Sequence, residues 1–506
     1  MVHEENGILM GVITPETLNY KEAAFDLLII GSGAGGGTCA GFLIEDGMNV
    51  AIVEEGDYIP PDELPKSVGE AFLKLYRNGG ARFIFGVPGI AFAEGMCVGG
   101  STVINGGMCW RTPEKVLEKW KLEEGIEKIE PSFMERYFDK IEKRINVEEQ
   151  PPHTWSKAGV IFKNAAESLG WKVVTDRRNQ KGCKGLSLCM AGCPAGAKQS
   201  VLHTYIQDFL KKDGTIFAGL RAERIIFKGN RAIGVFCKGK GRELTIKAKI
   251  IVLACGADET PSLLMRSGFK SSSGMLGKNL YVHPNVKAVG VFDEELFQWR
   301  GAHQSHQVHE FRDEGILLAT AGVPPSMVAM SVEETGRKLG EFMENIKNML
   351  FAGALIEDTG TGMVKNIIGG KPILLYNIND YDFYRVKRAL SLLSILLFEG
   401  GAKEVILPFR NFKSIKSPAQ IPLIFDNKIK KMDTEMMTVH IMGTAKMSGS
   451  PKRGVVDSWG RVYGTENIFI CDASIFPSPI GLNPMLSIMG FSARTAEYIL
   501  ENRHRL

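Results

Sequence analysis

The stretch LLIIGSGAGGGTCAGFLIEDGMNVAIVEEG, residues 27–56, decides the fold. It holds two short apolar runs that predict buried parallel strands, joined by a glycine-rich turn and a helix. Gly31, Gly33 and Gly36 lie at that turn, where close backbone approach and the helix N-terminus favour a pyrophosphate. Glu54 ends the second strand, in position to accept ribose hydroxyls. We interpret the unit as a dinucleotide site rather than a structural turn, although the motif alone does not separate FAD from NAD.

The composition favours a small-molecule partner. The chain has 506 residues, 61 basic and 57 acidic side chains, and a net charge of +4, which argues against a nucleic-acid groove. Its N-terminus has no basic segment followed by a long apolar run, and no apolar stretch reaches the roughly 18 residues of a spanning helix. We expect a soluble, cytoplasmic protein without a transmembrane segment, with export in complex with a signal-bearing subunit left open.

Four further segments carry glycine, asparagine or histidine in unusual density. The first, EGMCVGGSTVINGGMCWRTP (94–113), is a backbone-rich loop suited to lie against a flat ring system, or else an ordinary surface loop. Its candidate contacts are Gly99, Gly100, Ser101, Asn105, Gly106, Gly107 and Met108. The others are IIVLACGADETPSLLMRSG (250–268), HPN (283–285), and the C-terminal VVDSWGRVYGTENIFICDASIFPS followed by GLNP.

These motifs, in this order, resemble those of the glucose-methanol-choline (GMC) family of FAD oxidoreductases, and the resemblance runs from Phe25 to the end of the chain. It implies an α/β fold, with a Rossmann-like FAD-binding domain and a substrate-binding cap of antiparallel sheet plus helices. We expect the FAD domain to be discontinuous. Its first parts would be residues 20–285, including a helical or lid insertion at 115–180 and a Cys-rich segment at 181–200. The cap would be 286–435, and 436–506 would complete the FAD domain.

Oxidising an alcohol to a carbonyl requires a base for the hydroxyl proton and an acceptor for the hydride, which the flavin supplies. The resemblance places the base at His440 and its partner at Asn483, because an imidazole titrates near neutral pH and an amide can hold the substrate oxygen. It also places Asp472 near the flavin, where the alternative is a strand-end cap. The loop at 97–110 has no histidine, so we expect noncovalent FAD.

Three of the nine cysteines, Cys183, Cys189 and Cys193, stand in CKGLSLCMAGCPAGAK, with the spacing C-x5-C-x3-C-P. This spacing keeps the register of a ferredoxin-like run that lacks one ligand. It also resembles the GMC branch of sugar dehydrogenases that carry a [3Fe-4S] cluster and pass electrons to a cytochrome partner. Inert buried thiols are the alternative, and zinc would want a fourth ligand. We read His303, His306 and His309 as a polar wall of the cap rather than a metal site.

The resulting prediction is an FAD-dependent alcohol dehydrogenase with an iron–sulfur relay to an external acceptor, which could be a protein subunit. Two alternatives remain at this stage: an oxidase that returns electrons to dioxygen without a cluster, and a redox-silent flavoprotein lyase. The substrate could be a sugar, a sterol or an aliphatic alcohol, because the sequence motifs point in different directions.

Overall fold

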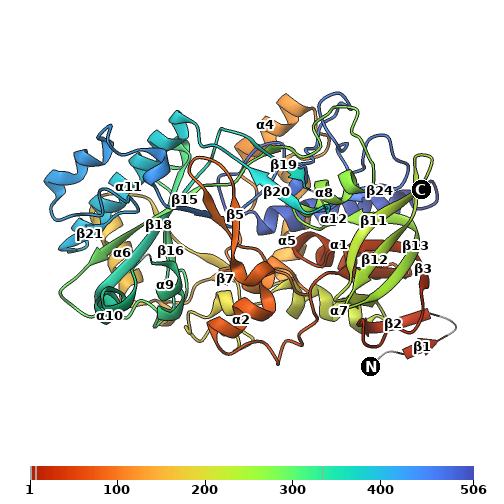
Figure 1. The fold of residues 1–506 in the computed structure, drawn as a ribbon, viewed down its shortest axis with the longest axis horizontal. Helices are drawn as coiled ribbons and strands as arrows, with labels where there is room; N and C mark the ends of the chain where they lie inside the picture. The colour runs from red at the N-terminus through yellow and green to blue at the C-terminus, as the bar shows by residue number, and fades with distance from the viewer. Residues whose placement is uncertain (1–2, 6–7, 333, 368) are drawn as a thin grey trace.

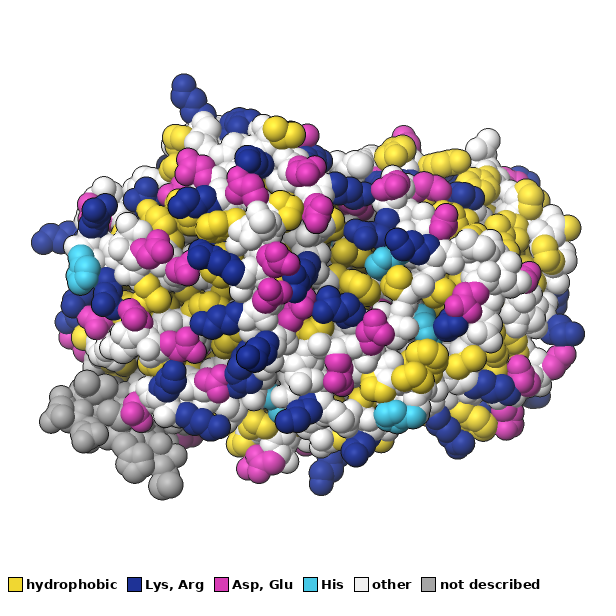
Figure 2. All heavy atoms as spheres, turned by 180° about the vertical axis from the view of Figure 1, so that it is seen from behind, with side chains coloured by type: hydrophobic (Ala, Val, Ile, Leu, Met, Phe, Trp, Pro, Cys, Tyr) yellow, Lys and Arg dark blue, Asp and Glu magenta, His cyan; other side chains and the backbone are white. Residues whose placement is uncertain are grey.

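The computed structural model describes residues 3–5, 8–332, 334–367 and 369–506. Two large sheets lie side by side along the long axis of the molecule, and both chain ends lie on the side of the first sheet (Figure 1). Lysine and arginine side chains are interspersed with aspartate and glutamate over the face shown in Figure 2. Among the described residues, no helix is both long and apolar enough to span a bilayer.

The first sheet is built around the glycine-rich turn. Its strands follow the order β1-β2-β10-β4-β3-β13-β12-β11, and β24 pairs with β13. The bounds are β1 His3–Glu5, β2 Ile8–Ile13, β3 Glu22–Ile30, β4 Val50–Glu54, β10 Thr215–Ala218, β11 Arg221–Lys228, β12 Arg231–Gly239, β13 Arg242–Leu253 and β24 Ile468–Ile470. The central strands β4, β3 and β13 run parallel, and their apolar residues are buried on both faces, as the continuous runs predict.

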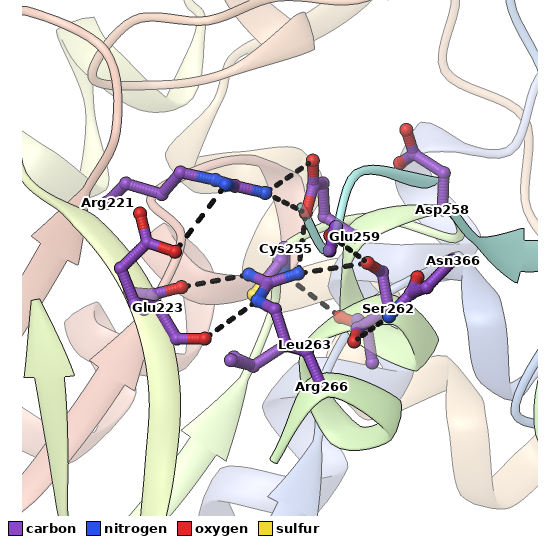
Figure 3. Close-up of polar contacts among 12 residues, drawn as sticks. Arg221, Glu223, Cys255, Asp258, Glu259, Ser262, Leu263, Arg266 and Asn366 are labelled. Atoms are coloured by element: carbon purple, nitrogen blue, oxygen red, sulfur yellow. Dashed lines mark hydrogen bonds and ion pairs between the residues drawn. The ribbon is translucent and has the colours of Figure 1, made fainter. Parts of the chain in front are cut away.

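Helices from distant parts of the sequence cover this sheet. Helix α1 (Ala34–Ile44) follows β3 and packs against α7 (Tyr205–Lys211) and the C-terminal α12 (Met485–Asn502). Helix α8 (Glu259–Arg266) is fastened to β11 by Arg266, which donates to the carbonyl oxygens of Ala222 and Glu223 and to Glu259 (Figure 3). This anchoring fixes the segment that connects β13 to α8, which lies beside the glycine-rich turn.

The second sheet follows the order β5-β6-β23-β15-β18-β17-β16-β8, with β21 on β15 and β22 on β21. The bounds are β5 Arg82–Ile84, β6 Ile90–Phe92, β8 Val173–Thr175, β15 Asn285–Val291, β16 His306–Val308, β17 Ile316–Thr320, β18 Met349–Ile356, β21 Glu404–Ile406, β22 Ser414–Ile415 and β23 Met436–Thr438. The long helix α11 (Asp380–Glu399) packs against β15 and β18 on one face. The opposite face carries the polar residues of the site described below.

The remaining elements are short. They are the strands β7 Val147–Glu149, β9 Arg177–Asn179, β14 Lys278–Leu280, β19 Gly362–Asn366 and β20 Pro372–Leu375, and the helices α2 Val68–Leu75, α3 Ser101–Ile104, α4 Glu114–Glu124, α5 Pro131–Arg144, α6 Lys157–Ser168, α9 Pro325–Ser331 and α10 Gly336–Asn345. The α/β class, with a parallel nucleotide-binding-type sheet and a mainly antiparallel second sheet, is confirmed. The division at 285 and 435 stays a prediction.

Candidate active site

The glycine-rich turn leaves no room for side chains. Gly31 has φ +96°, and a methyl group there would lie 2.3 Å from the carbonyl oxygen of Ala254. A methyl group on Gly36 would lie 1.9 Å from the carbonyl oxygen of Gly31. Gly33 precedes the first residue of α1, so the free N–H groups of that helix point toward the turn. The turn therefore has the exposed backbone and the helix N-terminus that a pyrophosphate requires.

Glu54, the last residue of β4, connects that strand to the glycine-rich turn through Ser32. Its carboxylate accepts hydrogen bonds from Ser32 N at 3.0 Å, Ser32 Oγ at 2.7 Å and Gly56 N at 2.9 Å. Burial raises the pKa of Glu54, and these donors oppose that shift. Ser32 Oγ in turn accepts from Gly99 N at 3.0 Å, which brings the second glycine cluster onto the turn. The expected role of Glu54 toward ribose stays a prediction.

The loop at 99–108 lies between the turn and the second sheet. Gly100 comes so close to Gly33 that a methyl group on it would sit 2.8 Å from Gly33 Cα, and Ser101 Oγ accepts from Gly95 N at 3.0 Å. Asn105 lies 3.0 Å from Met485 Sδ at the start of α12. The following residues, Gly106, Gly107 and Met108, pass between Gln304, Asn179 and Arg178. The loop is thus an inner surface built largely of backbone, rather than an ordinary exposed loop.

Two buried cations hold this loop in place. Lys198 Nζ donates to the carbonyl oxygens of Val103 at 2.6 Å, Asn105 at 2.8 Å and Cys189 at 2.6 Å. Arg178 Nε donates to the carbonyl oxygen of Gly106 at 2.9 Å. Sequence reasoning did not select Arg178, because nothing in its local sequence distinguishes it from a surface arginine.

These features fit FAD. The glycine turn suits a pyrophosphate, and the loop at 99–108 offers a flat backbone surface to a ring system. Several buried polar atoms near this region have no partner among the described residues, including Trp110 Nε1, Asn179 Oδ1 and His440 Nδ1. A bound cofactor and substrate would give such atoms partners.

Asp472 has a structural role in this arrangement. It precedes the short 3-10 helix Ala473–Ile475, whose Ser474 N donates to its Oδ1 at 2.9 Å. Its Oδ2 accepts from Gly256 N at 3.0 Å and from Thr260 Oγ1 at 2.5 Å. Asp472 thus caps a strand end and ties it to α8, which was the alternative interpretation. Its expected proximity to the flavin stays a prediction.

His440 and Asn483 come together from segments 43 residues apart. Asn483 Nδ2 lies 3.5 Å from His440 Nε2, while His440 Nδ1 has no partner among the described residues. His440 follows β23 and is held by its own N–H, which donates to Thr438 Oγ1 at 3.0 Å. Burial lowers the pKa of His440 to about 4, so the imidazole is neutral at pH 7 and can accept a proton. Asn483 stands two residues before α12 and is fixed by that helix start.

Three neighbours complete this polar group: His283 from the HPN motif, His309 from the predicted polar wall of the cap, and Gln307, which the sequence analysis did not select. The ring of His283, from the HPN motif, lies 5.6 Å from that of His440. Gln307 Nε2 donates to Asn483 Oδ1 at 3.3 Å, and its Oε1 lies 3.1 Å from His309 Nε2. HPN could have pointed to His283, but Gln307 is brought in only by the pairing of β16 within the second sheet.

The predicted cluster at Cys183, Cys189 and Cys193 finds no support. Across residues 3–5, 8–332, 334–367 and 369–506, no group of three or more histidine, cysteine or acidic side chains is arranged to hold a metal. Each sulfur instead accepts from a separate donor: Gly185 N at 3.4 Å for Cys183, Arg178 Nη2 at 2.9 Å for Cys189, and Lys198 N at 3.4 Å for Cys193. Burial opposes ionisation of Cys189, yet the adjacent Arg178 and Lys198 lower its pKa overall. The segment braces the loop at 99–108.

Comparison with known proteins identifies the family and the fold. Two family profiles, both described as GMC oxidoreductase, match residues 72–285 and 373–492. A GMC-type oxidoreductase of Mycobacterium tuberculosis is 32% identical over 93% of this chain and 75% of its own length. A long-chain-alcohol oxidase of Arabidopsis thaliana is 27% identical over 92% of this chain and 67% of its own. A formate oxidase variant from Aspergillus oryzae shares the fold, with a TM-score of 0.75 and 17% identity over 96% of this chain and 100% of its own.

Proposed function

This chain belongs to the GMC oxidoreductase family and is an FAD-dependent oxidoreductase that acts on CH–OH donors, and from this we propose its catalytic groups and its electron acceptor. His440 is the base that removes the hydroxyl proton of an alcohol, and Asn483 holds the alcohol oxygen. When bound, FAD would supply the acceptor for the hydride that leaves the carbinol carbon.

The pairing of His440 with Asn483 carries this proposal. Asn483 lies between the two other side chains, within 3.5 Å of His440 and 3.3 Å of Gln307 on β16. A neutral imidazole with an unpartnered ring nitrogen can take a proton, whereas the neighbouring amide offers a donor without competing for that proton. His283, 5.6 Å from His440 between ring centroids, limits how the imidazole can turn.

For the acceptor, we propose dioxygen, which would be reduced to hydrogen peroxide as the alcohol becomes a carbonyl. The names of several relatives, the long-chain-alcohol oxidases among them, support an oxidase. The second candidate, an iron–sulfur relay to a protein partner, needs Cys183, Cys189 and Cys193 to share a cluster. Iron and acid-labile sulfide analysis of protein purified without oxygen tests it, and about three irons per flavin would restore the relay.

The test of the catalytic assignment is flavin bleaching by primary alcohols without oxygen, followed in a stopped-flow spectrometer. We expect His440→Ala to slow bleaching by about 10²–10⁴-fold, the usual contribution of a general base. His153→Ala, at an exposed histidine, is the matched control and should bleach as the parent does. An unchanged rate in His440→Ala would remove His440 from the chemistry. Absence of bleaching by any alcohol would favour the redox-silent lyase.

A further inference from the structure

One face of the strands β5, β6 and β23 carries apolar side chains that are exposed to solvent. Phe83 on β5 pairs with Ala91 on β6, and Ala91 pairs with Met437 on β23. Paired residues on neighbouring strands point to the same face. Phe83 is 61% exposed and Ala91 is exposed as well, so this row faces outward. Val439, two positions after Met437, is also exposed and directly precedes His440.

The same face continues onto the small sheet of β14, β19 and β20. Phe85 lies two residues after Phe83, which places both rings on one side of the extended chain, and it is 59% exposed. Phe85 pairs with Leu375 on β20, and Leu375 pairs with Met363 on β19. Val87 follows and is half-exposed. Since β5 stands between β15 and β20 (Figure 1), this docking face, as we call it, extends over both sheets.

The opposite face of these strands is buried in the core of the second sheet. Ile84, Ile90 and Leu374 all belong to that core. Phe85 N donates to the carbonyl oxygen of Leu374 at 2.9 Å, and Tyr376 N donates to that of Phe85 at 2.9 Å. The exposed rings therefore stand on a backbone that is fixed from behind.

Lysines border the docking face at its β14 and β19 end. Lys278 on β14 pairs with Met363, and Lys365 stands two residues after Met363 on the same side of β19. Lys371 directly precedes β20. All three lysines are exposed, and among the residues that the structure describes none of their ammonium groups has an acidic partner within 4 Å. The exposed Glu435, just before β23, lies at the opposite border.

The exposed area and the charge decide which partner this face fits. The large side chains Phe83, Phe85, Val87 and Val439 together expose on the order of 400 Å². A stable protein dimer takes about 800 Å² from each partner, so the face is small for a second copy of the chain. Binding to a bilayer requires only that a few apolar side chains enter the acyl region while lysines reach anionic headgroups.

We propose that this face docks the enzyme on an anionic phospholipid bilayer. Phe83 and Phe85 enter the acyl region, and Lys278, Lys365 and Lys371 contact the headgroups. Docking is peripheral and involves no covalent step. It does not depend on the reaction proposed above, although Val439 places the docking face one residue from His440 in the chain.

The test is sedimentation of the FAD-loaded enzyme with vesicles of equimolar phosphatidylcholine and phosphatidylglycerol. We expect Phe83→Ser combined with Phe85→Ser to lower the partition coefficient by about 10²-fold. Replacing the three lysines by glutamine should lower it about fivefold for each lysine and should weaken its dependence on salt. Leu122→Ser, at an exposed leucine on α4, and Lys247→Gln, at an exposed lysine on β13, are the controls and should bind as the parent does. Circular dichroism and FAD content confirm that each variant is folded.

A depth measurement shows which residues enter the bilayer. Brominated acyl chains should quench the added fluorescence of Phe83→Trp but not that of Leu122→Trp. The inference is wrong if the parent does not sediment with these vesicles, or if the phenylalanine variant binds them as tightly as the parent. It is also wrong if sedimentation velocity shows a dimer of the parent that the phenylalanine variant loses, without vesicle binding by either, since a second copy would then cover the face.

Discussion

Lys198→Met should loosen the loop that we expect to face the flavin. Lys198 is 2% exposed, and its ammonium donates to three carbonyl oxygens, those of Val103, Asn105 and Cys189, at 2.6–2.8 Å. Methionine fills a similar volume but donates nothing, so three buried acceptors lose their partner. Hydrogen bonds from charged groups contribute about 1.5–3 kcal/mol each, and partial relaxation leaves a net loss of about 3–5 kcal/mol.

The consequence should appear in cofactor affinity as well as in stability. Re-ordering residues 103–106 around FAD would cost about 3 kcal/mol in the variant, which corresponds to an FAD dissociation constant about 10²-fold higher. The assays are fluorescence titration of apoprotein with FAD and urea unfolding of the loaded enzyme. Lys247→Met removes an exposed ion pair with Glu22 and should change stability by less than about 1 kcal/mol. Equal FAD affinity and equal urea midpoints in the two variants would refute the bracing role of Lys198.

Further predictions concern packing and pH. Gly35→Ala should abolish FAD binding, because the added methyl group would lie 1.5 Å from the carbonyl oxygen of Cys471, whereas Gly69→Ala, with nothing within 4 Å, should fold and bind FAD normally. The free energy of unfolding should fall as pH decreases from about 6.5 to 4, by roughly 1.4 kcal/mol per pH unit for each buried neutral histidine. Burial lowers the pKa of His303 and His306 to about 4. As the pH falls, these histidines therefore take up protons in the unfolded chain before they do so in the folded protein. Chemical denaturation at several pH values checks this prediction. The rate of flavin bleaching should be flat near neutral pH and decline only as pH approaches 4, where His440 takes up a proton; a decline centred near 6.5 would show an imidazole with an ordinary pKa in the working site.

The sequence was sufficient to predict those features that depend on residues close together in the chain. The βαβ unit at 27–56 follows from two apolar runs and glycines whose spacing matches a tight turn, and the structure places Gly31, Gly33, Gly36 and Glu54 at that turn. The antiparallel strands at 221–253 follow from short apolar runs separated by glycine-containing turns. The pairing of His440 with Asn483 was predictable from a resemblance carried by several motifs rather than from either residue alone.

The cysteines show a prediction from local spacing that the described residues do not support. C-x5-C-x3-C-P describes separations along the chain, but the left-handed conformation at Cys193 and the separate donors near each sulfur are set by what packs against the segment. Arg178 comes from β9, and Lys198 reaches back to residues 103–105. These long-range contacts assign the segment a bracing role that its sequence does not encode.

The sequence by itself determined the family and the glycine-rich turn, because both depend on residue types at fixed separations within short motifs. The tertiary structure alone decided which strands of the second sheet are neighbours. That pairing sets Lys287, Gly353, Ala319 and Gln307 in one row, although they are spread over 67 positions of the chain. This register arises from the packing of a whole sheet, which no short stretch of sequence specifies.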